Sequence, residues 1–160
     1  MARTVLVQGT AIDDGSDAFA ADLAAVLAER TRNAVLVTRH VNVSTPATAG
    51  TTWKPDPGVG VEDPAAARQN LIDSAEALIV HAPSLERSSA GLDWASLVDV
   101  VLIVAARDVA DRRVVAATAG SLRPLGARVV GAVLLNPKGG GSLSDRIRPS
   151  GQAQTATERD

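Results

Sequence analysis

The segment QGTAIDDGSD, from Gln8 to Asp17, contains a turn that can bind phosphate and carboxylates that disfavour phosphate binding. Gly15 stands directly before a helical pattern, where the backbone N–H groups of a loop and a helix start can hold an anion. Binding a nucleoside triphosphate also requires a lysine for the β and γ oxygens and a hydroxyl for magnesium. Ser16 occupies the lysine position and Asp17 occupies the hydroxyl position.

The aspartates of this loop determine whether a bound anion is attracted or repelled. We expect Asp13 and Asp14 to face the same pocket. Two unit charges 4 Å apart repel by roughly 4 kcal/mol at an effective dielectric of about 20, whereas a helix N-terminus stabilises a bound anion by only about 0.3–1 kcal/mol. Repulsion is the larger effect, so the sequence predicts no cofactor and no metal at this degenerate loop, whose residues of interest are Gly9, Asp13, Asp14, Gly15, Ser16 and Asp17.

The three aspartates admit two interpretations. They form either a solvated turn, with Ser16 or Asp17 as the helix N-cap, or a cluster for a divalent metal or phosphoryl group like that of response-regulator receivers. A receiver has its acidic pair directly after the first strand and its accepting aspartate at the end of the third. Gln8 and His81 occupy those places here. The solvated turn is therefore the favoured interpretation.

Other candidate residues lie outside the loop. His81 follows a predicted strand, where it is either a general base or a side chain that fills the place of a lost aspartate; we favour the second, because no catalytic spacing accompanies it. Trp53 and Trp94 fall in segments predicted to be irregular, and each either covers the core or anchors an interface. Four arginines offer an anion-binding rim or a subunit contact, although ordinary surface ion pairing is favoured: Arg39, Arg107, Arg112 and Arg113.

Hydrophobic patterning predicts the elements that position these residues. Five parallel strands are expected at Val5–Gln8, Ala34–Thr38, Ala77–Val80, Val98–Ala105 and Arg128–Leu135. Helices are expected at Asp17–Glu29, Pro64–Ser74, within Ser88–Leu97 and at Asp111–Leu122. The proline-rich stretch His40–Glu62 is a predicted loop with an edge strand at Val41–Val43. Alternating strands and helices predict a three-layer, doubly wound α/β domain with a mainly parallel sheet, in which Val98–Ala105 is the central strand.

Composition limits the class of protein. The chain has 160 residues, 46% hydrophobic and 21% charged, which is typical of one globular domain. We expect this domain to span residues 1–138 and the polar, glycine-rich segment 139–160 to be disordered. A net charge of −2 without basic blocks argues against nucleic acid as a partner. No apolar run is long enough to span a membrane, so we expect a cytoplasmic location, either alone or as part of a longer chain.

The order of strands, glycine turn and helix resembles a known family. The segments VLVQGTAIDDGSDAFAADLAAVLAER, AVLVTRH, EALIVHAPS, LVDVVLIVAARD and LGARVVGAVLLN together resemble the P-loop domain of bacterial tyrosine kinases and chain-length regulators of capsule and exopolysaccharide export. These belong to the deviant-Walker ATPases, which include chromosome-partitioning proteins. The resemblance covers residues 4–137 and implies a P-loop fold.

The chain departs from this family at each catalytic motif. The family's first motif resembles PGEGKST, which is matched here by the seven residues from Ile12 to Ala18, IDDGSDA. Its DAD motif is matched by the residues from Thr38 to His40, and the aspartate of its DTPP motif is matched by His81. The chain has no tyrosine, whereas the family carries a tyrosine-rich tail.

These departures lead to three hypotheses. The first is a catalytically inactive, P-loop-like interaction or regulatory domain, the cytoplasmic part of a polysaccharide-export or chain-length protein. Its partner would be itself, a homologous P-loop protein or a membrane-embedded export component. The second is a divergent ATPase or tyrosine kinase that a partner completes with a cation. The third is a signalling domain that uses the aspartate cluster.

Overall fold

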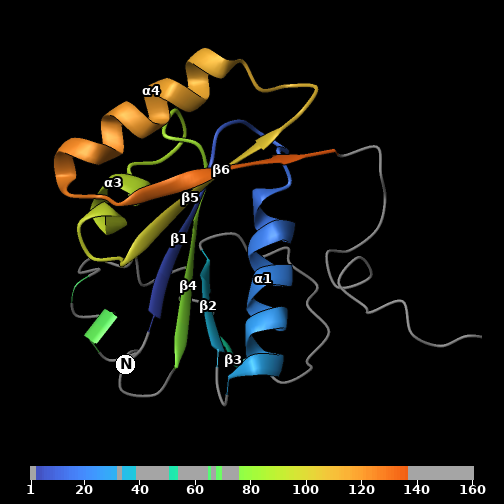
Figure 1. The fold of residues 1–160 in the computed structure, drawn as a ribbon, viewed down its shortest axis with the longest axis vertical. Coiled ribbons are helices and arrows are strands. Elements are labelled where there is room, and N and C mark those ends of the chain that lie inside the picture. The colour runs from blue at the N-terminus through green and yellow to red at the C-terminus, as the bar shows by residue number, and fades with distance from the viewer. Residues whose placement is uncertain are drawn as a thin grey trace, which may run out of the picture.

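The chain forms a six-stranded parallel sheet between helices, as the computed structural model in Figure 1 shows. The structure describes residues 3–31, 34–38, 51–53, 65, 68, 69 and 76–136. The strands are β1 (Arg3–Gly9), β2 (Ala34–Thr38), β3 (Thr51–Trp53), β4 (Ala77–Ala82), β5 (Val100–Ala106) and β6 (Val129–Leu135). They follow the order β3-β2-β4-β1-β5-β6, and every neighbouring pair is parallel.

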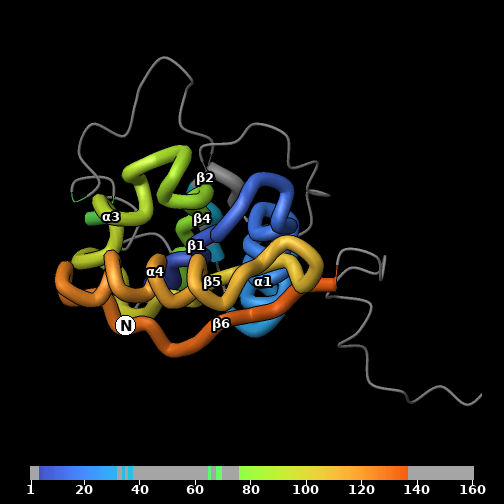
Figure 2. Tube along the Cα trace, turned by 90° about the horizontal axis from the view of Figure 1, so that it is seen from above, coloured from blue at the N-terminus to red at the C-terminus, as the bar shows by residue number. Residues whose placement is uncertain are grey.

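Helices cover both faces of the sheet. The described helices are α1 (Ser16–Arg30), α3 (Ala90–Ala95), α4 (Arg112–Leu122) and a 3₁₀ turn at Arg123–Leu125. The view from above places α1 on one side of the strands and α3 and α4 on the other (Figure 2). This arrangement confirms the predicted three-layer α/β fold.

The core consists of two aliphatic clusters, one on each face of the sheet. Along β1, Leu6 packs into the cluster that contains Trp94 of α3, while the next residue, Val7, packs into the cluster that contains Phe19 of α1. This alternation follows from the strand geometry, in which successive side chains point to opposite faces. Every residue of β4 is buried, as expected for a strand covered on both sides.

The strand order places the carboxyl ends of β1, β4 and β5 side by side. The chain passes from β1 through α1 to β2 on one side, and from β4 it crosses β1 to reach β5 on the other. Ligands in doubly wound sheets bind where the strand order reverses in this way. The loops after Gly9, Ala82 and Ala106 therefore form the edge to consider for a functional site.

Some predicted elements differ from the observed ones. β3 lies inside His40–Glu62, which was predicted to be a loop, because three β-branched and aromatic residues suffice to add a short strand beside β2. The predicted edge strand Val41–Val43 lies outside the described residues. Of the predicted helix Pro64–Ser74, Ala65, Arg68 and Gln69 are described, and all three are helical. The middle of the sheet is the β4–β1 pair, so the prediction of Val98–Ala105 as the central strand is wrong.

Candidate functional site: a loop closed by its own carboxylate

The β1–α1 loop folds its acidic side chain inward. Two of its residues have left-handed backbone angles, Asp13 with φ 55° and Gly15 with φ 77°. Successive left-handed and right-handed residues turn backbone N–H groups toward one concave side. Between these two residues, Asp14 carries its side chain into that concavity and is only 3% exposed.

The Asp14 carboxylate accepts hydrogen bonds from three backbone N–H groups of the loop. Oδ2 accepts from the N–H of Thr10 at 2.6 Å and of Ala11 at 3.0 Å. Oδ1 accepts from the N–H of Ser16 at 3.0 Å. Backbone N–H groups at this position are the groups that a P-loop offers to phosphate oxygens. A carboxylate of the chain itself therefore occupies the place of a bound anion.

The loop is closely packed around this carboxylate. A Cβ built on Gly9 would lie 2.7 Å from Ser16 Oγ and 3.0 Å from Asp14 Oδ2. Thr10 Oγ1 donates to the carbonyl of Val104 at 3.0 Å and ties the loop to β5. Gly9, Thr10, Asp14 and Ser16 are all buried.

Two of the substituted motif positions contact each other. The family resemblance matches Ser16 to a lysine and His81 to an aspartate, and Ser16 Oγ lies 3.0 Å from His81 Nε2. Both side chains are buried. His81 makes a further interaction. Thr38, at the third altered position, is the register partner of His81 across β2 and β4. His40 lies outside the described residues.

Gln8 fills the interior beneath the loop. Its Nε2 donates to the carbonyl oxygens of Pro83 at 2.5 Å and Gly9 at 3.0 Å. Gly91 of α3 leaves room for the Gln8 amide, since a Cβ there would lie 1.7 Å from Oε1. An amide with these contacts replaces the acidic pair that a receiver domain has at this strand end.

The aspartates do not share one environment, so the expectation that Asp13 and Asp14 face the same pocket is wrong. Asp13 and Asp17 are exposed, and Asp17 Oδ1 accepts from the N–H of Ala18 at 2.8 Å. The favoured solvated turn is also wrong for Asp14, because this side chain is buried and fully engaged. The N-cap of α1 is Gly15 rather than Ser16 or Asp17, and it makes no side-chain cap.

The described residues contain no cluster of three histidine, aspartate or glutamate side chains suited to a metal ion. They also contain no helix long and apolar enough to cross a membrane.

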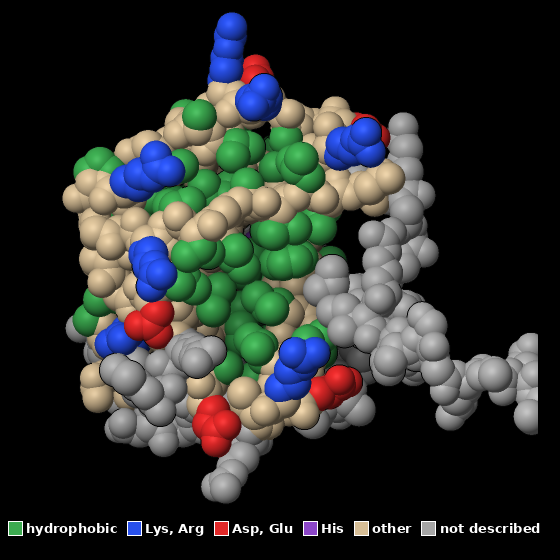
Figure 3. All heavy atoms as spheres, viewed as in Figure 1, with side chains coloured by type: hydrophobic (Ala, Val, Ile, Leu, Met, Phe, Trp, Pro, Cys, Tyr) green, Lys and Arg blue, Asp and Glu red, His purple; other side chains and the backbone are tan. Residues whose placement is uncertain are grey.

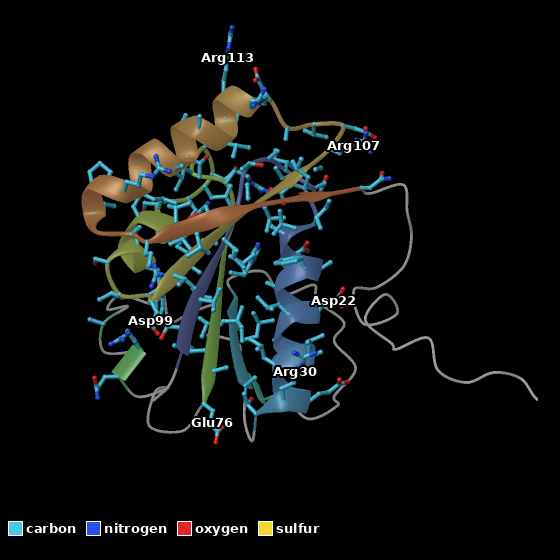
Figure 4. All side chains as sticks on the ribbon, viewed as in Figure 1. Asp22, Arg30, Glu76, Asp99, Arg107 and Arg113 are labelled. Carbon is cyan, nitrogen blue, oxygen red and sulfur yellow. The ribbon has the colours of Figure 1, made fainter. Side chains whose placement is uncertain are left out.

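The predicted interface residues are dispersed. Trp94 belongs to α3 and is 4% exposed, so it is a core residue and not an exposed anchor. Trp53 ends β3, which corrects its assignment to an irregular segment. Arg107, Arg112 and Arg113 are exposed around the β5–α4 connection. Figure 4 shows Arg107 on the loop after β5 and Arg113 in the first turn of α4, with Arg113 pointing away from the sheet. Arg39 lies outside the described residues.

Sequence reasoning missed the internal contacts of the site. Thr10 and Ala11 were not singled out, although their N–H groups hold Asp14. The Ser16–His81 contact was missed as well. One signal was available: both residues stand at altered motif positions, Ser16 at the start of the helix after the first strand and His81 near the end of another strand.

Comparison with known proteins identifies the fold. No family model matches the sequence, and no curated protein matches it. Among solved structures, the kinase domain of Escherichia coli tyrosine kinase ETK is similar, with a TM-score of 0.69 and 16% identity over 84% of this chain and 67% of that chain. The chimerical protein CapA2B2 has a TM-score of 0.70 and 13% identity, covering 84% and 76% of the two chains. The kinase domain of VpsO has a TM-score of 0.65 and 16% identity, covering 84% and 85%.

The loop arrangement and these similarities agree on one architecture. A glycine-containing turn joins the central strand β1 to the start of α1, and parallel strands flank β1 on both sides. In fold, the chain is similar to bacterial tyrosine kinase domains and has their P-loop architecture.

Proposed function

We propose that this chain is an inactive P-loop-like domain that binds no nucleotide and acts through protein contacts. Its setting would be the cytoplasmic part of a polysaccharide-export or chain-length protein, in line with its fold similarity to bacterial tyrosine kinase domains. Its partner would be a second copy, a homologous P-loop protein or an export component in the membrane.

One observation carries the proposal: the Asp14 carboxylate accepts the N–H groups of Thr10, Ala11 and Ser16. A triphosphate could use these donors only after displacing Asp14. The displaced carboxylate would remain a few ångströms away, where repulsion between unit charges amounts to roughly 4 kcal/mol at an effective dielectric of about 20. Each lost hydrogen bond to a charged acceptor would cost a further ~1.5–3 kcal/mol unless phosphate replaced it.

The positive charge that normally offsets such costs is missing from the loop. Ser16 stands at the lysine position, and its hydroxyl is paired with His81. Lysine occurs in this chain only at Lys54 and Lys138, distant in sequence from the loop. The first turn of α1 instead contains the acidic residue Asp17.

Calorimetric titration of the full chain with Mg-ATP and Mg-ADP tests the proposal. We expect no saturable heat and no rise in melting temperature at millimolar nucleotide, since a ligand that binds the folded state well above its Kd must stabilise it. Saturable binding would overturn the proposal and favour the alternative, a divergent ATPase or kinase that a partner completes.

A gain-of-function variant sharpens the test. Combining Asp14→Gly, Ser16→Lys and Asp17→Ser removes the internal carboxylate and restores the lysine and hydroxyl. We expect this variant to bind Mg-ATP. The matched control adds Ser16→Lys and Asp17→Ser while retaining Asp14, and it should bind much more weakly because the N–H groups remain occupied.

A further inference from the structure

Asp14 and Gly15 form a peptide unit that can modify itself. An aspartate followed by a glycine occurs only once in the chain, at these two positions. In such a pair the backbone nitrogen of the glycine can attack the side-chain carboxyl of the aspartate, because glycine has no Cβ to hinder the approach. The reaction is intramolecular, so it requires neither a bound substrate nor an open pocket.

The reaction forms a cyclic imide and releases water. The Gly15 nitrogen bonds to Cγ of Asp14 and loses its proton. One carboxyl oxygen leaves as water after taking up that proton and another from solvent. A water molecule then opens the ring. Cleavage between the nitrogen and Cγ restores aspartate, whereas cleavage between the nitrogen and the main-chain carbonyl carbon of Asp14 leaves isoaspartate, in which the main chain runs through Cβ and Cγ.

The Asp14 carboxyl is held differently from acidic side chains on the surface. Figure 3 shows acidic side chains near the rim of one face of the molecule. Asp14 is instead only 3% exposed, and both of its oxygens accept backbone N–H groups of the loop. The carboxyl that would have to react is therefore fixed inside the loop.

These hydrogen bonds oppose formation of the imide, which retains only one of the two carboxyl oxygens. Loss of Oδ2 would leave the N–H groups of Thr10 and Ala11 without their acceptor, and loss of Oδ1 would do the same to the N–H of Ser16. Buried N–H groups are costly to leave unpaired. Ring closure at Asp14 therefore requires the loop to open first.

We propose that the Asp14–Gly15 unit is a modification site at which isoaspartate forms when the β1–α1 loop opens. The product cannot restore the closed loop. Its main chain is longer by one carbon, and its carboxylate is bonded directly to Cα, so the side chain is shorter by one carbon. The three hydrogen bonds of Asp14 cannot form again in this geometry, and isoaspartate at position 14 marks chains whose loop has opened.

Mass spectrometry of the full chain after several weeks at neutral pH tests this proposal. Cleavage after Arg3 and Arg30 releases the peptide of residues 4–30, in which electron-transfer fragmentation distinguishes isoaspartate from aspartate at each position. We expect isoaspartate at position 14 to accumulate more than about tenfold faster in guanidinium chloride than in the folded chain, because denaturation removes the three hydrogen bonds. In guanidinium chloride, Gly15→Ala should slow the reaction, since the added methyl group hinders the attacking nitrogen.

Gly9→Ala tests the requirement for an open loop within the folded chain. The added Cβ would lie 2.7 Å from Ser16 Oγ and 3.0 Å from Asp14 Oδ2, so the loop has to shift. We expect isoaspartate to form several-fold faster than in the original folded chain. The matched control is Leu122→Ala, which leaves a cavity in the core cluster of Trp94 and lowers stability without touching the loop. This variant should form isoaspartate as slowly as the original chain, and circular dichroism checks that both variants are folded.

Equal rates in the folded and the denatured original chain would overturn the proposal, and this comparison depends on neither variant. Equal rates in folded Gly9→Ala and folded Leu122→Ala would overturn it as well. The inference rests on the hydrogen bonds of Asp14 and not on the proposed function. Because the measurement contains no nucleotide, its outcome is separate from that of the Mg-ATP titration.

Discussion

The β1–α1 loop and strand β6 differ in where their backbone hydrogen-bonding groups find partners. In the loop, three N–H groups of the kind that bind phosphate are satisfied by Asp14 of the same chain. In β6, the backbone groups of Ala132 and Leu134 point away from the only described neighbouring strand. The loop, which resembles a binding site in sequence, is therefore closed internally, while a plain apolar strand has an outer edge that no described strand covers.

Removing the Asp14 carboxylate should have the largest effect on folding stability. Asp14→Ala leaves the N–H groups of Thr10 and Ser16 buried without a partner, and we expect it to lower the free energy of unfolding by about 2–4 kcal/mol. Urea denaturation measures this loss, and sulfate should restore part of it by occupying the vacated donors. Asp13→Ala, at an exposed neighbour, should change stability by less than about 0.5 kcal/mol. Equal effects of the two substitutions would contradict the account.

A methyl group at Gly9 tests how tightly the loop is closed. The added Cβ of Gly9→Ala would lie 2.7 Å from Ser16 Oγ and 3.0 Å from Asp14 Oδ2. We expect a loss of about 1–3 kcal/mol, because overpacking forces the loop to shift. Thermal unfolding measures the change. Gly131→Ala is the control on β6, where nothing lies within 4 Å of the built Cβ; if it destabilised as much as Gly9→Ala, the difference in packing would be refuted.

The Ser16–His81 contact should contribute a smaller amount. A double-mutant cycle with Ser16→Ala and His81→Gln isolates its coupling energy, which we expect to be about 0.5–1.5 kcal/mol, the usual net value of one hydrogen bond. Additive effects of the two substitutions would show that the 3.0 Å approach of Ser16 Oγ to His81 Nε2 contributes nothing.

The smallest effect on folding is expected on β6. Leu134→Lys introduces a charge at a side chain that is 65% exposed, and it should change the free energy of unfolding of the monomer by less than about 0.5 kcal/mol. Loss of several kcal/mol of folding stability would show that Leu134 packs within the monomer and would remove the contrast with the loop.

Hydrophobic periodicity was sufficient to predict most of the fold. The apolar runs gave β1, β2, β4, β5 and β6, and helical spacing gave α1 and α4, with Asp111 capping α4 through the N–H of Arg113. β3 was missed because a three-residue strand among prolines and glycines has too few residues to show a period of two. The position of β5 in the sheet was misjudged, since an apolar run indicates burial but does not specify which strands lie beside it.

The interior of the site was less predictable. That Asp14 turns inward depends on the left-handed angles of Asp13 and Gly15, and a glycine can adopt either sign of φ. That Ser16 meets His81 depends on β4 lying next to β1, which pairs residues separated by 65 positions in the chain. Likewise the sequence VVGAVLL is equally compatible with a central strand and an edge strand, so its exposure emerged only from the sheet order.

NMR titration of the full chain with pyrophosphate tests the central claim most directly, because it observes the backbone amides of Thr10, Ala11 and Ser16 individually. If Asp14 occupies the anion position, these amide signals stay unchanged at millimolar pyrophosphate, and they shift saturably in Asp14→Ala. A saturable shift of the same signals in the unmodified chain would contradict the account, since it would show that an external phosphate takes these donors despite the carboxylate.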